Sequence, residues 1–356
     1  MGATDDLCLF TEGDELYDAM LDAIAAARSS VLLETYIFAD DEIGRRFAAA
    51  LIAAARRGVD VRLHIDAAGS LFWHSNTLAR QMLQGGVRLH WFHRWSWHQP
   101  WRYNRRNHRK MLVIDRQRVF LGGFNIHREN SRSVFGEQRW HDIHVSVSGA
   151  FAVQAGQLFE AFWRGVRRAW APPLPSGDML MSNHTRVGRR AMRYIYRDGF
   201  NRARACIDVT TPYFVPDHIT RQALIMAARR GVQVRLLLPR KTDVRIARWA
   251  AHASYARLLE AGVKIYEYLP RVLHAKTVVI DGHWAAVGTA NIDYRSFFVN
   301  YELNLITANP DLCHDLQQQF EHDLLQSEQV HGLHWGRRPW AERLLEMLAW
   351  WVRRWL

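Results

Sequence analysis

Two stretches of the chain carry the same five residue types in the same order and at the same spacing: histidine, lysine, aspartate, glycine and asparagine. The first stretch contains His108, Lys110, Asp115, Gly122 and Asn125. The second contains His274, Lys276, Asp281, Gly288 and Asn291. A single His-x-Lys on a strand is usually an ordinary surface pair, but a duplication that keeps every offset is hard to attribute to chance. We therefore interpret the two stretches together as one active site.

These residue types suit the displacement of an alcohol at a phosphate diester. Lysine and asparagine donors can hold the non-bridging oxygens and stabilise the charge that develops on them. One imidazole can attack phosphorus while the other protonates the alcohol that leaves. Because the two lysines already supply positive charge, the pattern predicts a site with no metal and no cofactor.

The segment between each histidine and its aspartate is apolar and rich in β-branched residues, which predicts a buried strand. Side chains alternate between the two faces of a strand, so His108 and Lys110 share one face and Asp115 points to the other. The second copy, which ends at Asp281, follows the same rule. The two aspartates complete the candidate catalytic set, but we expect their role to be structural.

The two stretches resemble the paired H-x-K-x4-D-x6-G-x2-N motifs of the phospholipase D superfamily, and the resemblance extends over roughly residues 7 to 325. Within that superfamily the chain is most similar to the bacterial cardiolipin synthases that lack N-terminal membrane spans. The segments that carry this similarity are VLLETYIFADDEIG, HRKMLVIDRQRVFLGGFNI and LHAKTVVIDGHWAAVGTANIDYRSFFVNYELNLI.

The resemblance implies a phosphatidyl transfer from one phosphatidylglycerol to another, giving cardiolipin and glycerol through a phosphatidyl-histidine. His108 is the expected nucleophile, and His274 is expected to act first as the acid and then as the base. The alternatives are a phospholipase D that hydrolyses phospholipids to phosphatidic acid, a nuclease or other phosphodiesterase, and a membrane or nucleic-acid binder without catalysis. Two complete sets of motif residues argue against the last.

Three further residues enter the site through the resemblance. In this superfamily an acidic residue downstream of each motif orients the opposing histidine, and the matching positions are Asp142 and Glu302. Thr289 stands where the family commonly places a hydroxyl on the phosphate, whereas the first copy has Gly123 at that position. The resemblance therefore implies one hydroxyl donor, supplied by the second copy alone.

The rest of the chain alternates predicted strands and helices, which favours an α/β fold. Local echoes such as AARRGVDVRLHI at 54–65 and AARRGVQVRLLL at 227–238 indicate an internal duplication. We expect two similar phospholipase D-like domains, each a mixed β-sheet flanked by helices, in a pseudo-twofold arrangement: residues 1–172 and 173–334. The Pro-rich segment 171–178 marks the boundary.

Tyr36 and Tyr213 follow predicted strands at positions that look equivalent in the two halves. We consider both as candidate substrate-binding residues that line the pocket. The alternative is a pair of tyrosines at the edge of the core.

Composition indicates an anionic partner. The chain of 356 residues carries a formal net charge of +12, and its 15 Trp residues favour a membrane interface over nucleic acid. We therefore expect an anionic phospholipid membrane with phosphatidylglycerol as partner and no nucleic acid. A homo-oligomer is compatible with the sequence. No signal peptide and no apolar run of transmembrane length is recognised, which predicts a peripheral protein on the cytoplasmic side of a bacterial inner membrane.

Two tryptophan-rich segments are candidates for membrane contact. Residues 89–106 interleave aromatic and basic residues and include Trp95, Trp97 and Trp101. A lipid surface, single-stranded nucleic acid and a packed loop all fit this pattern, and lipid is favoured. Residues 335–356 are expected to contain an amphipathic helix that lies in the membrane interface. Its candidate contacts are Trp340, Trp351 and Trp355; the alternative is a helix packed on the protein or on a partner subunit.

Overall fold

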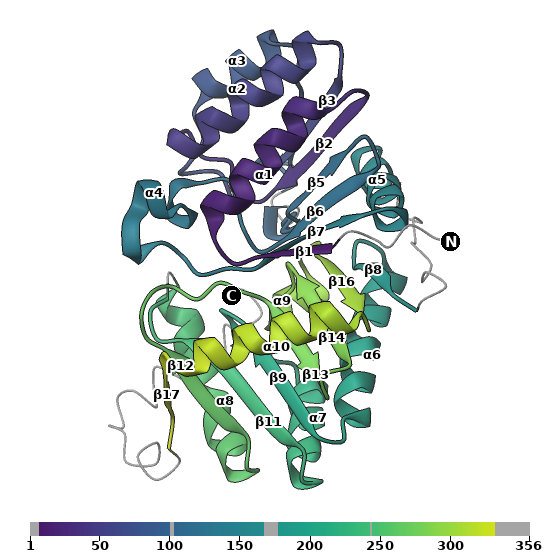
Figure 1. Cartoon of the computed structure of the whole chain (residues 1–356). Coiled ribbons are helices and arrows are strands. Elements are labelled where there is room, and N and C mark those ends of the chain that lie inside the picture. Colours follow the sequence, from purple (N-terminus) through teal and green to yellow (C-terminus); the bar gives the residue numbers. More distant parts are fainter. Residues whose placement is uncertain (1–6, 100–102, 167–176, 243, 332–356) are drawn as a thin grey trace. The chain divides into compact units, whose positions relative to one another are not determined.

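The computed structural model describes residues 7–99, 103–166, 177–242 and 244–331 (Figure 1). The chain divides into two compact units. The first unit is Met1–Gly188 together with Val287–Thr289 and Asn300–Leu305, and the second comprises Arg189–Ala286, Ala290–Val299 and Ile306–Leu356. Short pieces of the second motif region thus belong to the first unit. The Pro-rich segment 171–176 and the C-terminal residues 335–356 lie outside the described residues.

The first unit contains a seven-stranded mixed sheet with the order β1-β7-β6-β5-β2-β3-β4. Strands β2, β3 and β4 are parallel, and β5, β6, β7 and β1 continue the sheet in antiparallel pairs. The strand bounds are Leu7–Phe10 (β1), Ser30–Thr35 (β2), Asp60–Asp66 (β3), Arg88–Phe92 (β4), Met111–Ile114 (β5), Arg118–Gly122 (β6) and His144–Ser148 (β7).

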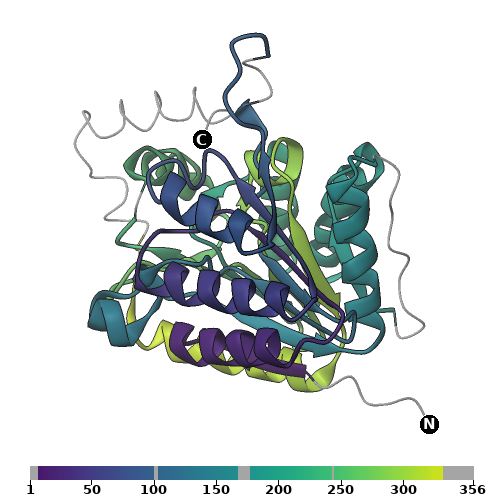
Figure 2. The same cartoon turned by 90° about the horizontal axis from the view of Figure 1, so that it is seen from above.

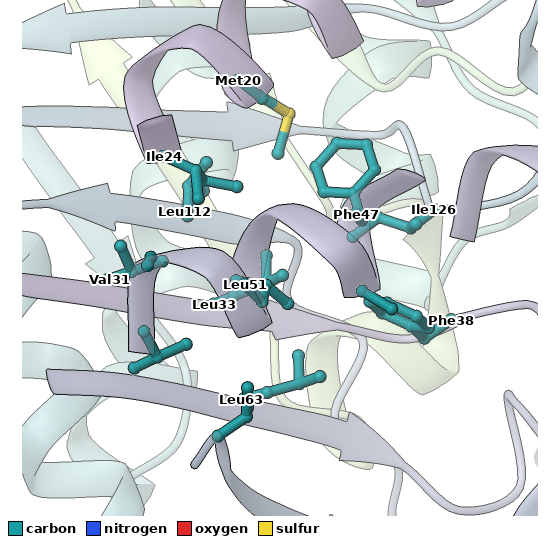
Figure 3. Close-up of a cluster of buried hydrophobic side chains, with 14 of the residues drawn as sticks. Met20, Ile24, Val31, Leu33, Phe38, Phe47, Leu51, Leu63, Leu112 and Ile126 are labelled. Atoms are coloured by element: carbon teal, nitrogen blue, oxygen red, sulfur yellow. The ribbon is translucent and has the colours of Figure 1, made fainter. Parts of the chain in front are cut away.

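Helices cover both faces of this sheet. On one face α1 (Gly13–Ala26), α2 (Glu42–Arg56) and α3 (Asn76–Gln84) lie side by side (Figure 2). Their apolar stripes pack on alternate residues of the strands, such as Leu33 and Leu63, because side chains of one strand alternate between the faces (Figure 3). Helix α5 (Ala150–Trp163) packs against β5, β6 and β7. The short elements η2, α4 and η3 span Arg128–Asn130, Arg132–Phe135 and Gly136–Gln138.

The second sheet has eight strands in the order β17-β12-β11-β9-β13-β14-β16-β8. Its strands are Met179–Ser182 (β8), Cys206–Thr210 (β9), Gln233–Pro239 (β11), Lys264–Tyr268 (β12), Thr277–Ile280 (β13), Trp284–Gly288 (β14), Leu303–Thr307 (β16) and Ser327–Gln329 (β17), and Phe214–Val215 (β10) pairs with Ile292–Asp293 (β15). The helices are Arg186–Arg202 (α6), His218–Arg229 (α7), Arg245–Glu260 (α8), Tyr294–Phe298 (α9) and Pro310–Leu324 (α10).

The two halves repeat one plan around the motif strands. In each half a parallel triplet (β2, β3 and β4; β9, β11 and β12) is followed by an antiparallel motif strand, β5 beside β2 and β13 beside β9. The prediction of an α/β fold with mixed sheets flanked by helices is therefore confirmed. The plan places the polar end of each motif immediately before a buried strand.

Candidate active site

His108 lies just before strand β5 and is almost fully buried. Its Nδ1 is 2.9 Å from Oε2 of Glu302 and 3.1 Å from the carbonyl oxygen of Thr289. Both neighbours are acceptors, so Nδ1 must be the protonated nitrogen. In a neutral imidazole the lone pair then resides on Nε2, which is the form that a nucleophile at phosphorus requires. The structure thus contains the pairing of Glu302 with the first histidine that the resemblance implies.

Glu302 is held in place by buried partners from the same unit. Its side chain is fully buried, and Oε2 accepts a hydrogen bond of 2.6 Å from the hydroxyl of Thr289. Its backbone N–H donates to the Asn183 side chain at 2.7 Å. The family resemblance implied that the Thr289 hydroxyl donates to the phosphate, whereas in the structure this hydroxyl donates to Glu302. Thr289 therefore positions the carboxylate, because an O–H group donates only one hydrogen bond.

Lys110 and Tyr36 lie beside the same imidazole. The Tyr36 ring is 5.0 Å from the His108 ring in an edge-on contact, and Nζ of Lys110 is 5.4 Å from the Tyr36 ring centroid. Nζ also donates to the backbone oxygen of His108 at 2.9 Å. Asn125 is anchored by its amide oxygen, which accepts from the backbone N–H of Ile37 at 3.1 Å. Since the oxygen is used, the NH₂ group is the part of Asn125 that can serve a ligand.

The equivalence of Tyr36 and Tyr213 that the sequence suggested is wrong by one residue. Phe38 bridges Ile126, and Phe214 pairs with Ile292 in the second half, so Tyr213 corresponds to Ile37. The sequence compared two tyrosines, but the strand register aligns the phenylalanines. Tyr36 contacts the ring of a motif histidine, His108.

Three polar side chains of the second motif, those of His274, Lys276 and Asn291, lie in the second unit and are buried. Nζ of Lys276 is 2.8 Å from Nδ1 of His274 and also donates to the His274 backbone oxygen. Asn291 donates through Nδ2 to Asp293 at 3.3 Å. Asp142, which the resemblance assigns to His274, belongs to the first unit, so this pairing remains a prediction.

The two motif aspartates perform the same structural task. The carboxylate of Asp115 accepts from the backbone N–H groups of Arg28, Ser29 and Ser30 at 2.8 to 2.9 Å. The carboxylate of Asp281 accepts in the same way, at 2.7 to 2.8 Å, from Arg204, Ala205 and Cys206. Partial burial disfavours the two charges, but the N–H groups prevail and hold both pKa values below the ordinary value. The expected structural role agrees with these contacts, which bind each motif strand to the preceding helix–strand turn.

Two buried polar groups near His108 were not singled out from the sequence. Asp66, at the end of β3, accepts from the backbone N–H of Asn107 at 2.7 Å and so holds the residue before His108. Burial raises the pKa of Asp66, against the opposing effect of Arg106. Arg109, between the motif histidine and lysine, donates to Glu34 at 2.7 Å, and both side chains are fully buried. Strand alternation was the available signal, since it sends Arg109 to the face opposite His108.

The candidate membrane residues are only partly described. Trp95 and Trp97 are 51% and 84% exposed, and their rings are 5.5 Å apart. Trp101, Trp340, Trp351 and Trp355 lie outside the described residues. No described helix combines the length and hydrophobicity that a bilayer crossing requires. Within the described ranges, no group of three or more His, Cys, Asp or Glu side chains is arranged to hold a metal ion.

Comparison with known proteins gives both sequence and structural relatives. A family model described as cardiolipin synthase, PLD-like domain, matches residues 20–163 and 196–324. Cardiolipin synthase 2 of Bacillus cereus is 35% identical over 94% of this chain and 68% of its own length. The cardiolipin synthase of Clostridium perfringens is 33% identical over 90% of this chain and 70% of its own.

Among solved structures, the fold is similar to that of phosphatidylserine synthase from Haemophilus influenzae. The TM-score is 0.76 at 13% identity, with 98% of this chain and 95% of that chain covered. This similarity concerns the fold. The family model and the sequence relatives confirm the family predicted from the two motifs, and with it the prediction of a phosphatidyltransferase. The chain belongs to the cardiolipin synthase family of phospholipase D-like enzymes.

Proposed function

We propose that this enzyme joins two phosphatidylglycerol molecules into cardiolipin and releases glycerol. The observation that carries the proposal is the contact of His108 Nδ1 with Glu302, which leaves Nε2 as the nitrogen with the lone pair. A carboxylate in this position also stabilises the positive charge that the imidazole acquires when Nε2 bonds to phosphorus.

In the first step, Nε2 of His108 attacks the phosphorus of one phosphatidylglycerol. The bond from phosphorus to the glycerol oxygen breaks, and His274 gives that oxygen a proton. Lys110, Lys276, Asn125 and Asn291 hold the non-bridging oxygens and stabilise the charge on them.

In the second step, His274 takes the proton of the terminal hydroxyl of a second phosphatidylglycerol. The resulting oxygen attacks phosphorus, the bond between phosphorus and Nε2 breaks, and cardiolipin leaves with the site restored. Asp142 orients His274 in this proposal as Glu302 orients His108.

Because both substrates are lipids, we place the enzyme at the surface of an anionic bacterial membrane, on its cytoplasmic side. Trp95 and Trp97 are the described candidates for contact with the membrane.

The direct test incubates the purified chain with phosphatidylglycerol vesicles and identifies the lipid and water-soluble products. Cardiolipin with an equal amount of glycerol supports the proposal, whereas phosphatidic acid alone shows hydrolysis. His108→Ala and His274→Ala should each abolish the reaction, while His314→Ala, at an exposed position on α10, should not alter it.

The assignment of the nucleophile has a separate test. Labelled phosphatidylglycerol and a short reaction time should trap an acid-labile phosphoryl group on His108. Label on His274 instead would reverse the two roles, and label on neither histidine would remove the covalent intermediate from the scheme.

A further inference from the structure

The second unit contains a basic pocket built by residues that are not part of the motif. It has a volume of about 280 Å³ and lies where helix α6 meets the beginning of helix α7. Helix α6 contributes Arg190, Arg193, Tyr194 and Arg197, and α7 contributes Ile219 with its capping residue Asp217. This volume is close to the lower limit of about 300 Å³ that is typical of small-molecule pockets.

The charge in this pocket is unbalanced. Arg193 is 3.4 Å from Asp217, and its guanidinium lies 4.2 Å from the Phe298 ring, so its position is set from two sides. Arg190 and Arg197 are exposed, and neither forms a salt bridge with a described residue. Three guanidinium groups therefore face one carboxylate. An anion that accepts several hydrogen bonds, such as a phosphate, would satisfy this arrangement.

The fold itself does not require this charge. Helix α1 has the position in the first unit that α6 has in the second, between the first strand and the strand beside the motif. Helix α1 contains four acidic and no basic residues, whereas α6 contains six arginines and one aspartate. Both helices bury an apolar stripe, so packing explains their apolar residues and not the sign of their charge.

Apolar side chains are exposed next to these arginines. Val187 and Tyr194 of α6 are 67% and 53% exposed, and Ile219 at the beginning of α7 is 44% exposed. On α6 the order Val187, Arg190, Tyr194, Arg197 has helical spacing, so apolar and cationic side chains alternate along one face. Arginines meet phosphates while aromatic and aliphatic side chains enter the acyl boundary when a protein lies on an anionic membrane.

We propose that the α6–α7 pocket binds the headgroup phosphate of an anionic phospholipid and holds the enzyme on the membrane. The exposed apolar side chains favour a lipid over nucleic acid. A nucleic acid could bind the same arginines, but its binding would not explain why Val187 and Ile219 are exposed beside them. The proposal goes beyond the catalytic function, because it concerns membrane binding and uses none of the motif residues.

The test compares the double variant Arg190→Gln/Arg197→Gln with a matched control, Arg56→Gln/Arg80→Gln. The control removes the same charge from exposed arginines of the first unit that have no described salt bridge. Sedimentation with phosphatidylglycerol-rich vesicles should show binding about 10- to 30-fold weaker for the α6 variant and nearly unchanged for the control. Equal losses in both variants, or no loss in either, would overturn the proposal.

Two further measurements identify the ligand and separate this proposal from the catalytic one. Tyr194→Ser should weaken binding to vesicles but not to soluble glycerol phosphate. If the loss of Arg190 and Arg197 weakens binding to single-stranded DNA but not to vesicles, the pocket binds nucleic acid instead. The α6 variant should retain the reaction rate on phosphatidylglycerol dispersed in detergent micelles. If the α6 variant binds vesicles normally but reacts slowly in micelles, the proposed role of the pocket in membrane binding is wrong. The catalytic roles proposed for the motif residues would be unaffected by that result.

Discussion

The two motif copies have the same contacts at their aspartates, but they differ in the residue that lies beside the downstream acidic residue. Asp115 and Asp281 each accept three backbone N–H groups from the turn before the neighbouring strand, at nearly equal distances. The residue after the motif glycine differs: Gly123 stands opposite Asp142, and Thr289 stands beside Glu302.

This difference has a steric and a polar reason. A Cβ atom on Gly123 would overlap the carboxylate of Asp142, so the first copy has no room for a side chain at this position. In the second copy the Thr289 hydroxyl fills the space and donates to Glu302 at 2.6 Å. Glycine is thus the neighbour of Asp142, where a side chain would clash, and threonine is the neighbour of Glu302, where its hydroxyl donates a hydrogen bond. The two copies therefore have the same motif residues but different residues around the downstream acids.

The largest effect is expected when the Glu302 charge is removed. Glu302→Gln keeps the size of the side chain but loses the carboxylate that faces His108 and Thr289. Cardiolipin formation should fall by about 10²- to 10⁴-fold in kcat/KM, because the imidazole loses its orienting anion. The comparison predicts a similar loss for Asp142→Asn. An unchanged rate in a folded Glu302→Gln protein would show that this contact is not catalytic.

Exchanging the residues after the motif glycines should be the next most severe change. Gly123→Thr forces a side chain into the Asp142 carboxylate and should lower the free energy of unfolding by about 3 kcal/mol. Thr289→Gly removes the hydroxyl that bonds Glu302 and the Leu303 N–H and should cost about 2 kcal/mol. Denaturant unfolding measures both. Thr289→Ser, which keeps the hydroxyl, is the control, and wild-type stability in Gly123→Thr would contradict the steric account.

The motif aspartates should affect stability and spare the chemistry. Asp115→Asn and Asp281→Asn should each lower the free energy of unfolding by about 2 kcal/mol at neutral pH, since charge-assisted bonds to backbone N–H groups are lost. Because folding lowers the pKa of both carboxyl groups, this stabilisation is complete above their pKa in the unfolded chain, about 3.9. It is lost as the pH falls through their lower pKa in the folded protein. The rate per folded molecule should persist. A large loss of rate with normal stability would make these residues catalytic.

The smallest effect at neutral pH concerns His144, which lies opposite Gly122 as Asn304 lies opposite Gly288 in the second copy. Burial, reinforced by Lys110 and opposed by Asp142, lowers the pKa of His144 to about 3. Between about pH 6.5 and this value the unfolded chain binds a proton that the folded chain does not. The free energy of unfolding therefore decreases as the pH is lowered, by up to about 1.4 kcal/mol per pH unit. His144→Asn should flatten the unfolding free energy over this window, and an identical pH profile would contradict the assignment.

Much of the site could be predicted from the sequence because its signals are local. The composition of the segment between His108 and Asp115 predicted a buried strand, and the structure has strand β5 there. The structural role expected for Asp115 agrees with its contacts with Ser29 and Ser30. The alternation of strands and helices was likewise sufficient to predict mixed sheets flanked by helices. Such patterns repeat within a few residues, so no knowledge of distant partners is needed.

The sequence by itself therefore determined the residue types, their duplication and the strands that bear them. The family resemblance implied that Glu302, 194 residues away in the chain, pairs with His108. Only the tertiary structure decided that this contact is made through Nδ1, that Thr289 gives its proton to the Glu302 carboxylate, and that Tyr213 aligns with Ile37. The reason is physical: hydrogen-bond partners and strand register depend on how remote segments pack, and a shift of one residue turns a side chain to the other face.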